Sequence, residues 1–121
     1  MHKPLRVDAV TLADGTEALS TTGAPSDAVA LAFLGVVERE IDLVVSGVNR
    51  GANLGHDVTY SGTVTAAMEA AISDVPAVAV SLNTREQANF EPAARFAASL
   101  VRETLKRGLP EGILLNVNVP H

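Results

Sequence analysis

Apolar residues recur along the chain with two different spacings, and the spacing distinguishes the expected helices from the expected strands. Three segments place apolar residues three and four positions apart, which is typical of one face of a helix. The first helix is expected to begin at residues 25–27, the second to follow Ser61, and the third to end at Gly108 and Pro110. Their apolar positions are, in chain order, Val29, Ala32, Phe33, Val36 and Val37; Val64, Ala67, Met68, Ala71 and Ile72; and Ala93, Phe96, Ala97, Leu100, Val101 and Leu105.

Continuous apolar runs that are too short for helices predict the strands. Residues 41–46, 76–82 and 112–120 read IDLVVS, PAVAVSL and GILLNVNVP, and such runs are typical of strands buried on both faces. A hairpin is expected over residues 8–21, where an Asp-Gly pair forms a favoured tight turn between strand-like flanks. Because strands alternate with helices, the pattern predicts one α/β domain over residues 1–121, a mainly parallel sheet with helices on both faces.

A polar segment rich in glycine, SGVNRGANLGHDVTYSGTVTAAMEAA, occupies residues 46–71. It leaves the carboxyl end of an expected strand, which is the side on which parallel sheets bind their ligands. Ser61, Gly62 and Thr63 then open a helix whose unpaired N–H groups and positive dipole end suit a phosphate. In the simpler interpretation Ser61 or Thr63 only caps the helix, which leaves the length of the preceding loop unexplained.

Several side chains in this loop carry chemistry, and each has a structural alternative. The side-chain oxygens of Asn49 and Asn53 can coordinate a hard cation, and their amides can donate to a phosphate. Asparagine also stabilises turns, however, and on the residues alone this is the commoner role. His56 and Asp57 could serve as a general base or as metal ligands, although such a pair in a polar loop is usually solvated. Tyr60 could stack on a ligand ring, but we expect it to pack beneath the loop.

The last expected strand carries two polar residues, and the known phosphate motifs are missing. Asn116 and Asn118 alternate along this strand, so they share one face and either line a site or bond to neighbouring loops. The sequence contains neither the GxxxxGK[ST] pattern of a P-loop nor the GxGxxG pattern of a dinucleotide-binding turn. A generic nucleotide-binding Rossmann module is therefore disfavoured.

Composition narrows the expected partners and compartment. The formal net charge is -5 and the Lys and Arg residues are scattered, so the chain lacks the basic patch that nucleic-acid polymers require. Cysteine is absent, which excludes disulfides and thiolate metal sites and agrees with a reducing compartment. We expect no membrane span, no signal peptide and a cytoplasmic location. A small anion held by backbone amides or by a metal is the ligand that fits this composition.

The polar segment and its surroundings also resemble a known family. DLVVSGVNRGANLGHDVTYSGTVTAAMEAA is similar to the signature of the SurE family, the stationary-phase survival protein E nucleotidases. GAPSDAV upstream, and PAVAVSLN and LNVNVP downstream, resemble that family in the same order, so the resemblance covers nearly the whole chain. It implies a Rossmann-like α/β core and a phosphatase that hydrolyses nucleoside 5′- and 3′-monophosphates, and in some members polyphosphate. It also implies one divalent cation, magnesium or manganese, and a homo-oligomer, either a dimer or a tetramer.

Matching the family's motifs residue by residue implies roles within the loop. Asn49 matches the asparagine of the family's metal site and would be a metal ligand. Ser61, Gly62 and Thr63 fall within the family's YSGTV motif and would hold the phosphate, with Asn53 as a further phosphate-binding candidate. Small residues would then let a phosphate lie against the backbone, where amides and hydroxyls replace its water.

The chain also departs from the family's pattern. Family members begin with a strand that ends in a paired-aspartate NDDG turn, and a following loop supplies a serine ligand; neither motif occurs here. Family members continue beyond the NVNVP segment, and Ala70 stands in place of a common glycine. We therefore expect an internal part of the family's domain, without its N-terminal strand-turn, its catalytic carboxylates and its C-terminal region. The alternative hypothesis is an inactive phosphate-binding or oligomer-forming remnant, and the upstream reading frame of the gene distinguishes the two.

Overall fold

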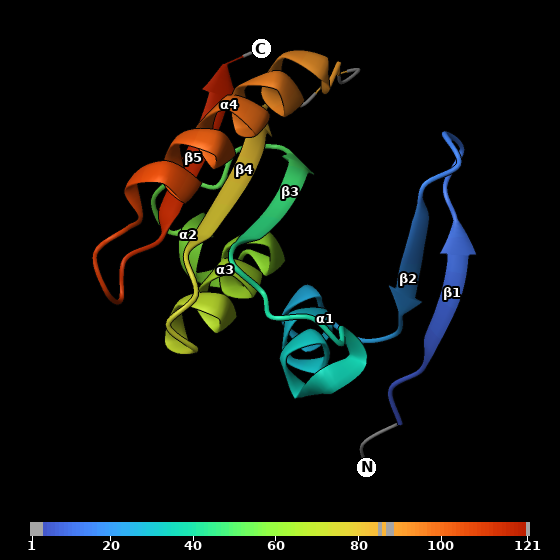
Figure 1. Ribbon diagram of the computed structural model, residues 1–121. Coiled ribbons are helices and arrows are strands. Elements are labelled where there is room, and N and C mark those ends of the chain that lie inside the picture. The colour runs from blue at the N-terminus through green and yellow to red at the C-terminus, as the bar shows by residue number, and fades with distance from the viewer. Residues whose placement is uncertain (1–3, 85, 87–88, 121) are drawn as a thin grey trace.

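Three parallel strands form the centre of the molecule (Figure 1). The computed structural model describes residues 4–84, 86 and 89–120. Strands β3 (Val44–Arg50), β4 (Ala77–Asn83) and β5 (Leu115–Pro120) lie side by side in that order, and each neighbouring pair is parallel. The carboxyl ends of the strands therefore lie at one edge of the sheet, as the sequence predicted.

The central strand β4 supplies side chains to two hydrophobic cores, one on each face of the sheet. Alternate side chains of a strand point to opposite faces, and helix α3 (Gly62–Ile72) covers one face while α4 (Glu91–Arg107) covers the other. The buried residues of the two cores are Ala77, Ala79, Val64, Ala67 and Ala70 on the α3 side, and Val78, Val80, Leu82, Ala93 and Ala97 on the α4 side. The predicted parallel sheet between helices is confirmed.

Some apolar residues that were expected on the packed faces of the helices are exposed. Ile72, Phe96 and Leu105 each leave more than half of their surface accessible, so their assignment to a packed face was wrong. The buried helix positions are mostly alanines, which let the helices approach the sheet closely and turn the bulkier residues outward. None of the described helices is both long enough and apolar enough to cross a lipid bilayer.

The first helical segment ends earlier than its apolar spacing predicted. Helix α1 (Pro25–Leu31) continues into the wider turns of η1 (Ala32–Val36), and Gly35 within η1 has a φ of 116°. Val37 is already extended, so it does not lie on a helical face, contrary to the prediction, because Gly35 ends the regular helix. The amino end of α1 packs on that of α3, where a Cβ on Gly62 would lie 3.1 Å from Pro25 Cγ.

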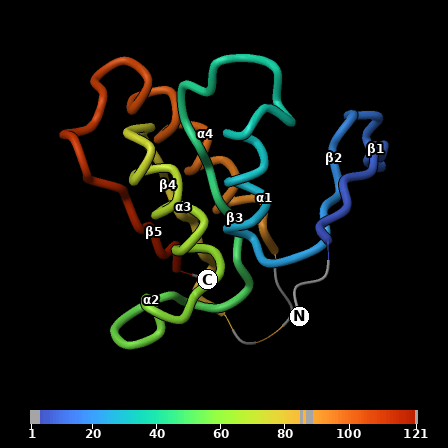
Figure 2. The backbone as a smooth tube through the Cα atoms, turned by 90° about the horizontal axis from the view of Figure 1, so that it is seen from below, coloured from blue at the N-terminus to red at the C-terminus, as the bar shows by residue number. Residues whose placement is uncertain are grey.

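The predicted hairpin is confirmed and stands apart from the parallel sheet, with α1 between them (Figures 1 and 2). Strands β1 (Val7–Thr11) and β2 (Glu17–Thr21) pair antiparallel. In the turn, the Asp14 carboxylate accepts a 2.9 Å hydrogen bond from the Thr16 backbone N–H. That bond stabilises the charged form, so it holds the pKa of Asp14 below its ordinary value.

Two strand boundaries differ from the predicted ones. β3 was expected to span residues 41–46 and to be buried, but it spans Val44–Arg50 and only part of each residue is covered. Among the described residues it lies at the edge of the sheet, which explains why its apolar run is half exposed. β5 begins at Leu115 rather than at residue 112 because residues 111 and 112 form a turn.

A glycine allows β3 to continue into the segment that was expected to be a loop. The register with β4 shifts between Ser46 and Asn49, and Gly47, inside this irregularity, has a φ of 121°. A Cβ at this position would overlap the backbone carbonyl oxygen of Val80 in β4. Only glycine fits both the backbone conformation and the close approach.

We expect Gly47→Ala to destabilise the fold more than Gly35→Ala. Both glycines have similar φ angles, but a Cβ at Gly35 meets nothing within 4 Å, whereas one at Gly47 overlaps β4. Gly35→Ala should lower the free energy of unfolding by about 1–2 kcal/mol through backbone strain alone. Gly47→Ala should cost at least about 2 kcal/mol more because the strands must separate. Urea unfolding of both variants measures the difference, and equal losses would show that the approach to Val80 is unimportant.

Candidate functional site

The carboxyl end of β3 meets the amino end of α3, and this junction brings two of the predicted site residues into contact. Asn49 is the residue before the last one of strand β3, and Thr63 is the second residue of helix α3. The hydroxyl of Thr63 donates a 3.2 Å hydrogen bond to Asn49 Oδ1. The predicted metal ligand and a predicted phosphate-binding residue therefore lie side by side.

The amide nitrogen of Asn49 determines which way its oxygen points. Asn49 Nδ2 donates to the carbonyl oxygens of Gly51, at 2.9 Å, and Arg50, at 3.3 Å. These bonds stabilise the turn that follows Asn49, which is the structural role that the sequence offered for this asparagine. The same bonds leave Oδ1 directed at Thr63, so the turn role and the ligand role are compatible in one side chain.

Ser61 caps α3, which confirms the simpler interpretation of this residue. Ser61 is 9% exposed, and its Oγ accepts a 3.1 Å hydrogen bond from the Val64 backbone N–H. Its carbonyl oxygen also accepts a 2.9 Å bond from the Thr65 hydroxyl. A phosphate role for the Ser61 hydroxyl stays a prediction, and such a role would have to share the oxygen with the cap.

The first two backbone N–H groups of α3 are the best anion donors at this junction. The N–H groups of Gly62 and Thr63 donate to no protein group among the described residues, as is usual for the first turn of a helix. The positive end of the helix dipole lies at the same place. Gly62 itself is explained by its contact with Pro25, so its small size serves packing as well as any close approach of a phosphate.

Asn53, the remaining phosphate-binding candidate, is held inside the loop by two strands. It is 5% exposed, and its Nδ2 donates a 2.6 Å hydrogen bond to the Ser81 hydroxyl at the end of β4. Its backbone N–H donates to Asn118 Oδ1 at 2.8 Å. Its carbonyl oxygen accepts bonds from Asn116 Nδ2, at 3.0 Å, and from Asn118 Nδ2, at 3.3 Å. Of the two roles considered for Asn116 and Asn118, the bond to a neighbouring loop is therefore the one observed.

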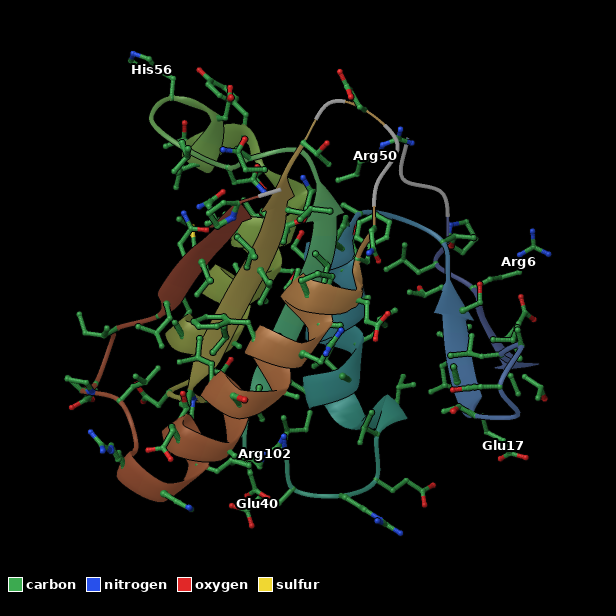
Figure 3. The ribbon with its side chains drawn as sticks, turned by 90° about the horizontal axis from the view of Figure 1, so that it is seen from above. Arg6, Glu17, Glu40, Arg50, His56 and Arg102 are labelled. Atoms are coloured by element: carbon green, nitrogen blue, oxygen red, sulfur yellow. The ribbon has the colours of Figure 1, made fainter. Side chains whose placement is uncertain are left out.

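The outer part of the loop is exposed. It forms the short helix α2 (Asp57–Tyr60), and both His56 and Asp57 are exposed; Figure 3 shows His56 at the tip, pointing away from the sheet. Tyr60 is 87% exposed, so the expectation that it packs beneath the loop was wrong. Within the described part of the chain, no three His, Cys, Asp or Glu side chains come together as they would around a metal ion.

Two residues of this region were not singled out from the sequence. Ser81 looked like part of an apolar run, and only its register beside Asn118 shows that it anchors the loop. Arg50, next to Asn49, donates from Nη2 to the Glu86 carbonyl oxygen at 2.8 Å and so ties β3 to the segment after β4 (Figure 3). A polar residue at the end of a buried strand was the available signal for Ser81.

The family model described as Survival protein SurE matches residues 1–121. The chain belongs to the SurE family. It is 52% identical over 122 residues to a 5′-nucleotidase SurE of Herpetosiphon aurantiacus, a match that covers 99% of this chain and 48% of the relative. It is 50% identical over 121 residues to a 5′-nucleotidase SurE of Geobacter sulfurreducens, covering 99% of this chain and 45% of the relative.

A solved SurE structure has the same fold. The crystal structure of the SurE protein from Aquifex aeolicus matches with a TM-score of 0.84 and 39% sequence identity, over 99% of this chain and 48% of that one. The resemblance inferred from the motifs and the Rossmann-like fold are thereby confirmed. This SurE chain spans about half the length of the curated relatives it matches.

We expect Ser61→Ala to weaken the SurE fold by about 1 kcal/mol, the usual cost of losing a helix cap. Ser61→Thr keeps a hydroxyl at the cap position and should recover most of that loss. Urea unfolding of the two variants measures the difference. An unchanged stability in Ser61→Ala would show that the bond to Val64 does not support α3.

Proposed function

We propose that this SurE chain belongs to an enzyme that hydrolyses nucleoside 5′-monophosphates with the help of a divalent cation, magnesium or manganese. The names of the Herpetosiphon and Geobacter relatives support the nucleotidase activity. The observation that carries the proposal is the contact of Asn49 Oδ1 with Thr63 Oγ1 at 3.2 Å. It joins the residue proposed as cation ligand to the start of the helix proposed to bind phosphate.

The oxygen atoms of Asn49 and Thr63 are of the chemical type that hard cations bind. Amide and hydroxyl oxygens are ligands that magnesium and manganese accept, and Asn49 Oδ1 is already oriented by the two bonds of its own amide. When bound, the cation would offset the negative charge of the phosphate and polarise its phosphorus–oxygen bonds. Because the described residues hold no cluster of three acidic or imidazole side chains, we propose that the carboxylate ligands come from outside them.

The amino end of α3 would bind the phosphate. The backbone N–H groups of Gly62 and Thr63 would donate to phosphate oxygens, and the helix dipole would favour their negative charge. As a water molecule attacks phosphorus, charge develops on these oxygens, and donors fixed in advance stabilise that charge without having to reorganise. The cap bond from Val64 to Ser61 keeps this first turn in place.

The wider family resemblance supports further parts of the proposal. We include hydrolysis of 3′-monophosphates and of polyphosphate, assembly into a dimer or tetramer, and a cytoplasmic location. We propose neither a nucleic-acid polymer nor a membrane as a partner, since the chain is acidic and its cations are scattered. The second candidate function is a phosphate-binding remnant without turnover, which the missing acidic cluster among the described residues favours.

Phosphate release from a nucleoside 5′-monophosphate in the presence of manganese tests the proposal. It is measured on the 121-residue chain and on the same chain extended by the flanking reading frame of its gene. Asn49→Ala should lower kcat/KM at least about tenfold, because removing a cation ligand weakens metal binding. Asn89→Ala is the matched control: it also removes an asparagine, one whose Oδ1 accepts a 3.2 Å bond from the Glu91 N–H.

Three outcomes of this assay decide between the candidates. Activity that needs manganese and falls in Asn49→Ala but not in Asn89→Ala supports the enzyme. Activity in the extended chain alone would locate the missing ligands in the added segments. A folded, extended protein that binds phosphate but releases none from a nucleotide would sink the enzyme proposal in favour of the remnant.

A further inference from the structure

Four hydrogen bonds join Asn53 to the ends of β4 and β5, and together they form a clamp on the loop. The clamp consists of Ser81, Asn116 and Asn118. Ser81 accepts from the Asn53 side chain, Asn116 donates to the Asn53 carbonyl oxygen, and Asn118 bonds both that oxygen and the Asn53 N–H. Ser81 and Asn118 are register partners in the parallel pair, so the loop is held across two adjacent strands. Figure 2 shows the loop with α2 and the end of β5 at the same end of the molecule.

The clamp replaces the backbone pairing that the loop lacks. A buried peptide group must find partners for its N–H and its carbonyl oxygen. At Asn53 both partners are side-chain amides of β5, and Asn118 serves both groups at once, with Oδ1 at 2.8 Å from the N–H and Nδ2 at 3.3 Å from the oxygen. This arrangement resembles the pairing with one more strand, although the partner is a side chain.

The clamp lies between the two ends of the loop that carry the proposed site. Asn49 precedes the loop and Ser61 ends it, with Asn53 between them. A free loop of this length samples many conformations, and fixing a point within it shortens the segments that can move. The bonds from Asn49 Nδ2 reach the carbonyl oxygens of Arg50 and Gly51, two to three residues from the clamped position. Loosening Asn53 would therefore loosen the groups that orient Asn49 Oδ1.

We propose that Asn118, together with Asn116 and Ser81, is a positioning residue for the SurE site. It acts through Asn53 to hold the loop so that Asn49 Oδ1 stays beside Thr63, and it touches neither the cation nor the phosphate. The inference rests on the proposed function, and it gives Asn53 the role of an anchor. The site then depends on β5, the strand of the sheet farthest from β3. The residues of β5 that contact Asn53 lie more than sixty positions after it in the sequence.

The test compares Asn118→Leu, which keeps the approximate shape but removes both polar groups, with Asn118→Asp, which keeps an acceptor for the Asn53 N–H. Hydrogen exchange is measured on the backbone amides of residues 51–56, and the manganese concentration for half-maximal phosphatase activity is measured on the same extended protein. Asn118→Leu should speed exchange at Asn53 at least about tenfold and raise the manganese requirement about tenfold. Saturating manganese should restore most of kcat. Asn118→Asp should show a smaller shift in both, and Asn89→Ala should show none.

A purely structural role would change different quantities. If Asn118 only stabilised the fold, the variants would lose folded protein and activity in proportion, with the manganese requirement unchanged; that result overturns the proposal. If Asn118→Leu does not fold, Asn116→Ala removes only one of the two donors to the Asn53 oxygen and should shift both readouts in the same direction, and no shift there overturns the proposal as well.

Failure of the proposed function would be visible separately. An unmodified protein that releases no phosphate refutes the nucleotidase proposal, whatever the variants do. Manganese binding, followed by calorimetry, then replaces the activity readout. Weaker manganese binding in Asn118→Leu together with faster exchange in the loop would still support the positioning role, and unchanged binding would contradict it.

Discussion

β4 is buried on both faces and paired on both edges, and the geometry of the candidate site depends on this constraint. A strand in that position cannot shift without disrupting both cores, so its backbone and side chains act as a fixed reference. The Val80 carbonyl oxygen excludes any side chain at Gly47 and so determines the path of β3 toward Asn49. One residue later, the Ser81 hydroxyl holds Asn53. The same strand therefore positions both the beginning and the middle of the loop that carries the candidate site.

Several polar groups of the loop form hydrogen bonds within the protein, and the candidate site consists of the donors and acceptors that these bonds leave available. Asn49 uses its amide nitrogen to bond the backbone and directs its oxygen at Thr63, and Ser61 uses its hydroxyl to cap α3. The structural and functional interpretations of these residues are thus complementary. In such a loop, rigid donors and acceptors are a requirement for chemistry, because groups that must reorganise lose their advantage in the transition state.

Much of the architecture could be predicted because local periodicity records which faces are buried. The run from Ala77 to Leu82 predicted a strand covered on both sides, and the Asp-Gly pair predicted the hairpin turn. The predictions that failed concern residues whose surroundings are not local. Tyr60 and Ile72 are large residues of a kind that is often buried, but both are exposed: Tyr60 lies in the outer helix α2, and α3 packs through small residues that leave Ile72 outside. β3 continues through Gly47 because this glycine fits against β4, and that close approach to a neighbouring strand is not visible in the local sequence pattern.

The sequence by itself determined the order of strands and helices, the place of the polar loop at the carboxyl edge and the family to which the chain belongs. These follow from periodicity, helix-start residues and a long, specific motif, all of which are local properties. Only the tertiary structure decided that Asn49 Oδ1 faces Thr63 and that Asn53 is held by Asn116 and Asn118. The physical reason is that these contacts depend on strand order and register, which bring together side chains that no local pattern relates.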